Sequence, residues 1–192
     1  DTLFNNTYIM NVGNITIIEE SFFNASTVYN EGILTIADSV FAYNDGVNYV
    51  AENYGNLAIF DSVFGSNVAN RAILFSKEGN LTVVGSDLIN NSATHIVQVN
   101  NNTLTIIDDS IFMNNTGSNV IRTQTDGILA VADSLFDNNN VTNVIYNQGT
   151  IAAVVDSEFT NVNNLAIKNQ ANLTLSGNII NTTSAKINNE GT

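Results

Sequence analysis

The feature that most constrains this chain is an internal repeat of about 22 residues that runs along its whole length. A small residue, most often glycine, opens each unit, and a Leu-x-Ile run and an Asp-Ser-x-Phe run follow it. The opening positions are Gly13, Gly32, Gly55, Gly79, Asn102, Gly127, Gly149, Ala171 and Gly191. A unit this short cannot bury a core alone, so the repeat predicts a solenoid in which stacked units share one core.

Apolar residues alternate with other residues inside each unit, as at Leu34 and Ile36 or Leu81 and Val83. Alternation over four to six residues predicts short β-strands, and the Val, Ile, Thr and Asn content disfavours helix. Each unit has room for three short strands and three turns. We therefore predict an all-β parallel β-helix with about eight coils in one domain over residues 1–192.

A leucine-rich repeat is the alternative, because the motif Leu-x-Ile-x-x-Ser-x-Phe-x-x-Asn is similar to its core. That fold needs a helix or a compact turn after the strand. Here the remaining residues carry a second strand pattern, as in residues 143–147, which favours the β-helix. Both ends of the chain fall inside the repeat, so we expect a fragment of a larger surface protein.

Stacking of identical units places like residues on like. The core phenylalanines should then share one buried layer: Phe4, Phe23, Phe41, Phe64, Phe112, Phe136 and Phe159, with Leu88 and Ile180 substituting. Two asparagine sets should lie at coil corners, where Asn tolerates left-handed backbone and stacked amides can form ladders. The sets are Asn44, Asn67, Asn91, Asn115, Asn139 and Asn161, and Asn11, Asn30, Asn53, Asn147, Asn169 and Asn189. These ladders would explain why 35 of the 192 residues are Asn.

Composition excludes several classes of function. The chain has no cysteine, which removes a disulfide scaffold and a cysteine nucleophile. Its 5 Lys and Arg against 18 Asp and Glu are too few to neutralise a nucleic-acid backbone, so we expect no nucleic-acid partner. No apolar run approaches the roughly 18 residues of a membrane helix, so we expect no direct membrane insertion.

The phrases Asn-x-Gly-x-Leu-Thr-Ile and Asp-Ser-x-Phe-x-x-Asn, with Ile-Tyr-Asn-x-Gly before the next coil, resemble adhesin-like surface proteins of methanogenic archaea. They are also similar to the repeats of chlamydial polymorphic outer membrane proteins, although the Gly-Gly-Ala-Ile motif of that group is missing. The resemblance covers the whole chain but rests on scaffold positions. It implies a secreted, extracellular protein of the cell surface. Its fold would be a right-handed parallel β-helix of the pectin-lyase-like type that presents an adhesive surface to cells or glycans.

An acidic residue lies three positions before each core phenylalanine in most units. The members are Glu20, Asp38, Asp61, Asp109, Asp133 and Asp156, and Gly85 and Gly177 interrupt the series. Stacked carboxylates can bind calcium or serve a pectate-lyase-like enzyme. Alternatively, Asp-Ser caps a turn by bonding backbone N–H groups. Because each coil offers one carboxylate and no convergent group, we expect turn capping, with no metal site and no cofactor.

A polysaccharide lyase or hydrolase on the same fold is the alternative to a non-catalytic module. A lyase needs basic residues, but Arg71 and Arg122 fall in different columns, and a net charge of −13 repels a polyanion. Hydrolysis needs two convergent carboxylates, whereas the neighbours Asp108 and Asp109 point to opposite faces of a strand. We therefore expect no catalytic residue.

The single histidine and the tyrosines are the remaining candidates for chemistry. His95 alone cannot build a His-based triad, and we expect it at a strand edge or on the coil surface. Exposed tyrosine faces could bind sugars. Tyr29 and Tyr146 share one repeat position, however, so we favour stacking over sugar binding.

The outward side of the first strand is the most suggestive surface, because side chains that alternate with the core set face out. Three residues after the opening positions lie Thr16, Thr35, Ala58, Thr82, Thr105, Ala130, Ala152 and Thr174, and Ile33, Phe60, Val84, Ile107, Ile128 and Val154 flank them. We predict Thr16, Thr35, Thr82, Thr105 and Thr174 as a strip that contacts a host or microbial cell-surface glycan or protein. Packing on flanking domains of the same chain and ice binding are the alternatives.

Overall fold

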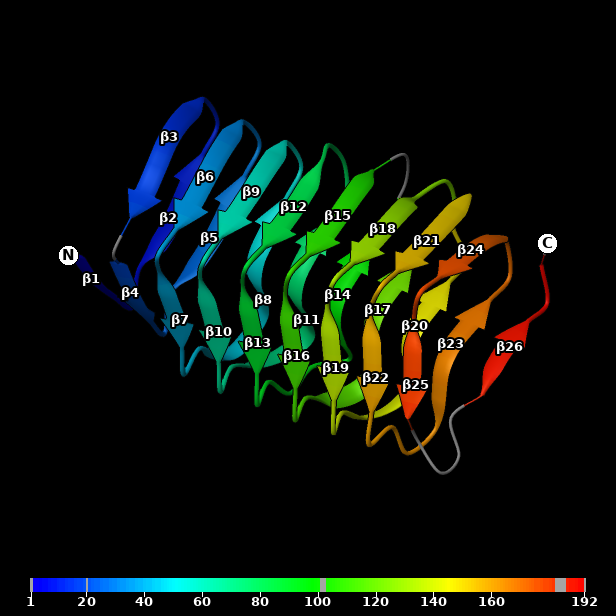
Figure 1. The fold of residues 1–192 in the computed structure, drawn as a ribbon. Coiled ribbons are helices and arrows are strands. Elements are labelled where there is room, and N and C mark those ends of the chain that lie inside the picture. Colours follow the sequence, from blue (N-terminus) through cyan, green and yellow to red (C-terminus); the bar gives the residue numbers. More distant parts are fainter. Residues whose placement is uncertain (1, 20, 101–102, 182–185, 192) are drawn as a thin grey trace.

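The computed structural model describes residues 2–19, 21–100, 103–181 and 186–191. These residues form three parallel sheets of nine, nine and eight strands, and none of them is helical. The strands stack coil upon coil along a rod whose N- and C-terminal ends lie at opposite ends (Figure 1). The predicted all-β parallel solenoid of about eight coils is confirmed, and the leucine-rich alternative is wrong because a third strand stands where its helix would be.

We call the sheets A, B and C. Sheet A contains β1 (Thr2–Asn5), β4 (Ser21–Asn24), β7 (Val40–Ala42), β10 (Val63–Gly65), β13 (Asp87–Ile89), β16 (Ile111–Met113), β19 (Leu135–Asp137), β22 (Glu158–Thr160) and β25 (Ile179–Asn181). Sheet B contains β2 (Tyr8–Asn11), β5 (Thr27–Asn30), β8 (Asp45–Asn53), β11 (Val68–Ser76), β14 (His95–Val99), β17 (Thr116–Thr123), β20 (Asn140–Asn147), β23 (Leu165–Asn169) and β26 (Ile187–Asn189). Sheet C contains β3 (Asn14–Glu19), β6 (Ile33–Ala37), β9 (Asn56–Phe60), β12 (Leu81–Val84), β15 (Leu104–Asp108), β18 (Ile128–Ala132), β21 (Ile151–Val155) and β24 (Asn172–Ser176).

The phenylalanine column is confirmed as the centre of the core. Rings from consecutive coils stack with centroids 4.0 to 4.9 Å apart, and Leu88 takes the place of one ring between Phe64 and Phe112. From Phe23 to Phe159 the column has no exposed surface. Burying a side chain of this size stabilises the fold by about 1.5–3 kcal/mol, so each coil adds its own share to a continuous core.

The first asparagine set forms a buried ladder from Asn44 to Asn139. In its middle, Asn91 Nδ2 donates to Asn115 Oδ1 (3.2 Å) and to the Phe64 carbonyl (2.8 Å), and Asn91 Oδ1 accepts from the Asn67 backbone and side-chain nitrogens (both 3.0 Å). The prediction was wrong for Asn161. That residue is exposed, and buried Val162 continues the column instead.

The second set forms ladders at both ends of the rod. Asn11 donates to Asn30 and Asn147 donates to Asn169, both at 2.7 Å. Between these ends the column contains Ser76, Val99 and Thr123. The predicted left-handed backbone at the ladder residues was also wrong. Positive φ occurs one residue before the first ladder, at Tyr43, Ser66, Asn90, Asn114, Asn138 and Asn161, because the turn has to be complete before the ladder side chain can point inward.

The acidic column lies at another corner, and there the backbone is left-handed. Asp38, Asp61, Asp109, Asp133 and Asp156 have φ of 45° to 47°, and Gly85 and Gly177 have φ of 60° and 66°. Glycine adopts this backbone most easily, which explains why it can interrupt the series. Glu20 lies outside the described residues.

The serine after each Asp makes the capping bonds. Ser86 N donates to Ser110 Oγ of the next coil (3.2 Å), and Ser86 Oγ donates to the Val84 carbonyl (2.9 Å). The same pair of bonds recurs from Ser39 to Ser134. At Ser157 the hydroxyl bond is kept, and the backbone nitrogen donates to Asn178 Oδ1 (3.0 Å). Turn capping is therefore confirmed, with serine as the capping residue. The bonds from a serine backbone nitrogen to the serine hydroxyl of the next coil join residues 18 to 24 apart, and this separation is the length of each coil.

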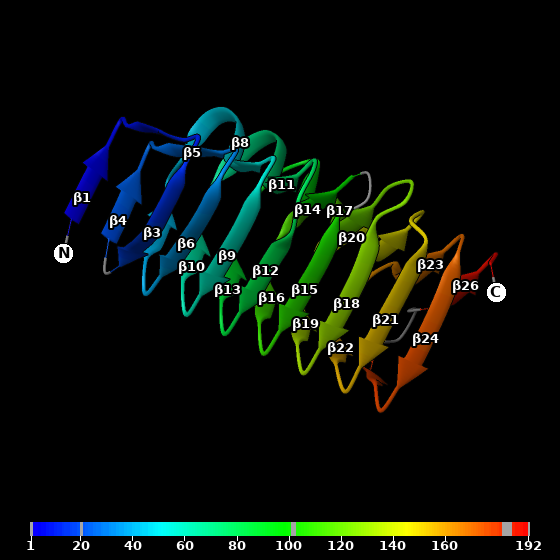
Figure 2. The same ribbon diagram turned by 90° about the horizontal axis from the view of Figure 1, so that it is seen from above.

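Sheet B differs from the other two sheets because its strands bend. β8 and β11 are nine residues long, the register shifts twice within β11, and both strands curve in the view from above (Figure 2). At the bend two consecutive residues are buried, such as Ile73 and Leu74, where a flat strand would alternate. The bend shapes the outer face of sheet B, on which the candidate site lies.

Candidate binding site on the outer face of sheet B

The outer face of sheet B collects most of the tyrosines and basic residues. Five of the six tyrosines lie in or directly after its strands, and four of the five basic residues lie over their rings. The pairs, with the distance from the charged group to the ring centroid, are Arg71 and Tyr49 (5.7 Å), Lys77 and Tyr54 (4.8 Å), Arg122 and Tyr146 (5.9 Å), and Lys168 and Tyr146 (5.1 Å). A chain with a net charge of −13 thus presents aromatic and cationic groups together on one face.

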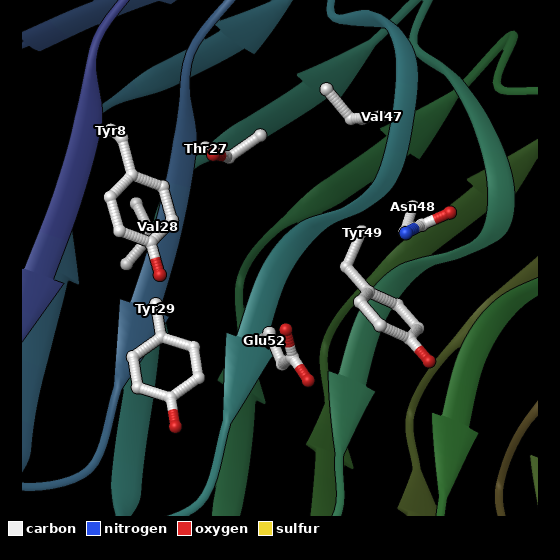
Figure 3. Close-up of a pocket in the computed structure, with 8 residues that line it drawn as sticks. All are labelled: Tyr8, Thr27, Val28, Tyr29, Val47, Asn48, Tyr49 and Glu52. Atoms are coloured by element: carbon white, nitrogen blue, oxygen red, sulfur yellow. The ribbon is translucent and has the colours of Figure 1, made fainter.

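A hollow of about 250 Å³ opens near the N-terminal end of this face. Tyr8 and Tyr29 lie on one side of it, Tyr49 lies on the other, and Glu52 lies between them (Figure 3). Thr27, Val28, Val47 and Asn48 complete the lining. The hollow forms where coil length changes. The serine spacing grows from 18 to 23 residues between the second and third coils, and the added residues lengthen β8 beyond β5.

Carboxylates hold Tyr29, which lines the hollow, and Tyr54, which lies beside Tyr29. Tyr29 Oη donates to Glu31 Oε1 (2.6 Å) and Tyr54 Oη donates to Glu52 Oε1 (3.0 Å). The bond to Glu31 raises the pKa of Tyr29 well above its usual value, so its hydroxyl stays protonated. The ring centroids of Tyr29 and Tyr54 are 5.3 Å apart.

The predicted column of Tyr29 and Tyr146 exists, but these two rings do not stack on each other. Glu52, Phe75, Gln98 and Arg122 lie between them in the register. Tyr29 therefore belongs to the aromatic hollow, and Tyr146 lies beside two cations nearer the C-terminal end.

A second hollow, of about 480 Å³, lies near the C-terminal end of the face. Arg122, Gln124, Thr125, Gln148 and Gln170 line it. Arg122 Nη2 donates to Gln148 Oε1 (3.2 Å), and Gln148 Nε2 donates to Gln170 Oε1 (3.1 Å). The lining is polar and carries one cation, in contrast to the aromatic hollow.

His95 lies next to Arg122 and is 5 % exposed, so the expectation of a surface position was wrong. Its Nε2 is 3.2 Å from Arg122 Nη1, and its Nδ1 is 3.0 Å from the Asn119 amide. Because a guanidinium can only donate, Nε2 of His95 accepts from Arg122 Nη1. Burial, and then the positive charge of Arg122, lower the pKa of His95 to about 4. The bend in sheet B covers this residue, and sequence alternation gives no sign of the bend.

The threonine strip is only partly on the surface of sheet C. Thr35 and Thr82 are half-buried and Thr174 is exposed, as predicted. Thr105 was wrongly placed. It pairs with Leu81 and Leu129 in the core column and has no exposed surface, and Ile106 takes its predicted position. The side chain of Thr16 lies outside the described part of the chain.

The same displacement by one residue affects three neighbours of the strip. Ala152, Ile107 and Val154 were expected to face outward, and all three are fully buried. The cause is the choice of opening residue. Thr103, and not Asn102, lies opposite Gly127, which displaces Ile107, and Asn102 itself is outside the described residues. Thr150, and not Gly149, lies opposite Gly127 on the other side, which displaces Ala152 and Val154. Close backbone contact favours glycine at the opening positions from Gly32 on, since a Cβ at Gly55 would clash with the Gly32 carbonyl oxygen, whereas Gly13 has open space around it.

Within the described ranges, no three His, Asp or Glu side chains come close enough together to hold a metal ion. In the same part of the chain, no helix is long and apolar enough to cross a bilayer. No protein-family model and no curated protein sequence matches the chain. The class defined so far is therefore a parallel β-solenoid with one bent sheet.

Proposed function

We propose that this chain is a non-catalytic module of a cell-surface adhesin that binds glycans along the outer face of sheet B. The observation that carries the proposal is the aromatic hollow, in which Tyr8, Tyr29 and Tyr49 surround a space of about 250 Å³ beside Glu52. Sugar rings pack their C–H faces on aromatic rings, and tyrosine offers such a face together with a hydroxyl. Glu52 and Asn48 supply the few polar groups that fix the orientation of a ligand in such a site.

The wider context of the proposal is a secreted, extracellular protein that contacts glycans or proteins of host or microbial cells. The resemblance of the repeat to archaeal adhesin-like proteins supports that setting. We further propose that the solenoid is right-handed and of the pectin-lyase-like type. Its support is the strong preference for right-handed crossovers between parallel strands of one sheet.

The threonine strip on sheet C is the second candidate surface. Exposed Ile33, Ile106 and Ile128 stand beside Thr35 and Thr82, which gives a flat face with apolar and hydroxyl groups. A flat face can pack on another protein or on a flanking domain. It offers no hollow to hold a sugar ring, and this favours the outer face of sheet B for glycans.

An enzyme of the polysaccharide lyase or hydrolase type is the competing function. It would use Glu31 and Glu52, the carboxylates nearest the tyrosines of the aromatic hollow. Both carboxylates accept hydrogen bonds from tyrosine hydroxyls, an arrangement suited to holding the rings in place.

The test is a glycan array followed by calorimetric titration of the selected glycan and by analysis of its ends. We expect binding without new reducing or unsaturated ends, and at least tenfold weaker binding for Tyr29→Ala and Tyr49→Ala. Tyr43→Asn is the matched control, because Tyr43 is 65 % exposed outside the hollow and its φ of 57° suits asparagine. The appearance of new reducing or unsaturated ends would contradict the non-catalytic adhesin and support the enzyme. Equal binding by all variants would show that the aromatic hollow is not the contact site.

A further inference from the structure

Arg122 is a cation that the fold holds in place without a counter-ion. Three groups position its guanidinium. They are His95 Nε2 on β14, the Tyr146 ring on β20, and Gln148 Oε1 in the segment after β20. No carboxylate among the described residues forms an ion pair with it. In a chain with 18 acidic residues, this neutral environment is unusual for an arginine.

One donor of this guanidinium is unsatisfied. Nε of Arg122 is buried and finds no acceptor among the described residues, while Nη1 and Nη2 each have one. A buried donor without a partner costs about 1–3 kcal/mol. The edge formed by Nε and Nη2 is also the edge that a carboxylate grips with both oxygens. A carboxylate in the adjoining hollow would replace Gln148 at Nη2 and give Nε the acceptor that it lacks.

The rest of the hollow suits a sugar. Gln124, Gln148, Gln170 and Thr125 line it with neutral amides and a hydroxyl, which can donate to and accept from ring hydroxyls. Its volume of about 480 Å³ holds a group larger than a free inorganic anion. Lys168 lies over the Tyr146 ring, and its charge is offset by Glu190, which accepts from Gln170 Nε2 (2.7 Å) at the edge of the hollow. Arg122 is therefore the cation available to a ligand.

We propose that the hollow beside Arg122 binds an acidic sugar, with the sugar carboxylate on the Nε–Nη2 edge of Arg122 and its hydroxyls on the three glutamines. Together with the aromatic hollow on the same face, this site would make glycan binding selective for sugars that carry a carboxylate. The choice of a sugar as the ligand rests on the proposed glycan-binding function. The experiments below can contradict the acidic-sugar site without contradicting glycan binding on this face.

The test uses the methyl glycoside of glucuronic acid and its methyl ester, two probes that differ only in the charge of the carboxyl group. Side-chain ¹⁵N resonances of the intact chain are followed during titration. We expect the acid to shift the Arg122 Nε–H and Gln148 amide signals, with a Kd at least tenfold below that of the ester. Equal binding of acid and ester, or no binding of the acid, would overturn the proposal.

Two variants and one further probe complete the design. Arg122→Gln should reduce acid binding to the level of the ester, and Arg122→Lys should retain part of the preference, because lysine keeps the charge but not the planar fork. Tyr43→Asn, outside both hollows, should leave acid binding unchanged. Inorganic phosphate that displaced the acid at equal concentration would show a general anion site and contradict the sugar assignment. If the chain binds glycans on the array but does not prefer the acid over the ester, the acidic-sugar site is contradicted and the proposed glycan-binding function is not.

Discussion

At the scale of single residues, the core tolerates a few polar groups that its own columns cannot satisfy. Thr105 is the clearest case. It occupies a position that is leucine in the coils on either side, it is fully buried, and its Oγ1 has no hydrogen-bond partner among the described residues. A hydroxyl in this situation loses its hydration and gains nothing in return, so Thr105 is a weak point of an otherwise apolar column.

Thr105→Val should therefore stabilise the protein by about 1–2 kcal/mol, because the substitution replaces an unsatisfied hydroxyl by a methyl group of similar size. The measurement is the free energy of unfolding in urea. Thr82→Val is the matched control. Thr82 is one column away and half-buried, and its replacement should change stability by less than about 0.5 kcal/mol. A destabilised Thr105→Val variant would show that the hydroxyl has a partner after all.

His95 gives a pH dependence whose sign is fixed. Its folded pKa of about 4 lies below the unfolded value near 6.5, so the unfolded chain binds more protons between these pH values. The contribution of His95 to stability is present above pH 6.5 and is lost as pH falls toward 4. Melting temperatures measured from pH 7 to 4 should fall more steeply for the wild type than for His95→Gln. Parallel curves would contradict the buried neutral histidine.

The misplaced threonine also shows what the sequence could and could not predict about single positions. Counting forward from the opening residue failed because turn lengths vary between coils. Counting seven residues back from the core column places Thr105 before Phe112 as it places Leu81 before Leu88, and this puts Thr105 in the core. Residues that occupy the packed column give a more reliable register than residues in turns.

At the scale of elements, the asparagine ladder and the Asp-Ser corners have different structural roles. The ladder satisfies buried carbonyls and N–H groups between sheets A and B, and the Asp position supplies left-handed backbone between sheets C and A. Both elements were evident in the sequence as columns. The sequence left open which residue of each corner makes the turn, because side-chain direction depends on backbone that repeats do not reveal.

Asn91→Ala should cost about 3–5 kcal/mol, since it removes four buried hydrogen bonds and leaves the Phe64 carbonyl and the Asn67 amides without their partners. Asn140→Ala is the control in an exposed position, with an expected change within about 0.5 kcal/mol. Urea denaturation measures both changes. Similar values for the two variants would mean that the ladder does not stabilise the stack.

The acidic column can be tested as a conformational feature. Asp133→Gly should be close to neutral, because glycine already occupies this corner at Gly85, whereas Asp133→Ala should cost about 1–2 kcal/mol for left-handed backbone at φ of 46°. A chelator should leave the wild-type melting temperature unchanged. A calcium-dependent melting temperature, or equal losses for both variants, would favour a role for the carboxylate itself.

At the scale of the whole molecule, most of the irregularity of the solenoid lies in sheet B, with one further register shift between β3 and β6 in sheet C. Period-two alternation predicted three sheets, and the described residues form three. It could not predict the bend in sheet B. That bend accompanies the added residues and the register shifts of β8 and β11. On the outer face of the same sheet, Tyr8 and Tyr49 line one hollow and Arg122 lines another. The most informative surface was therefore the least regular part of the repeat.

The most direct test of glycan binding on sheet B is a map of backbone amide shifts for the intact chain, titrated with the glycan that the array selects. We expect the shifted amides to lie in β5, β8, β11, β17 and β20, around the two hollows. Shifts confined to sheet C, around Thr35 and Thr82, would contradict binding on sheet B and would show that the threonine strip is the contact surface.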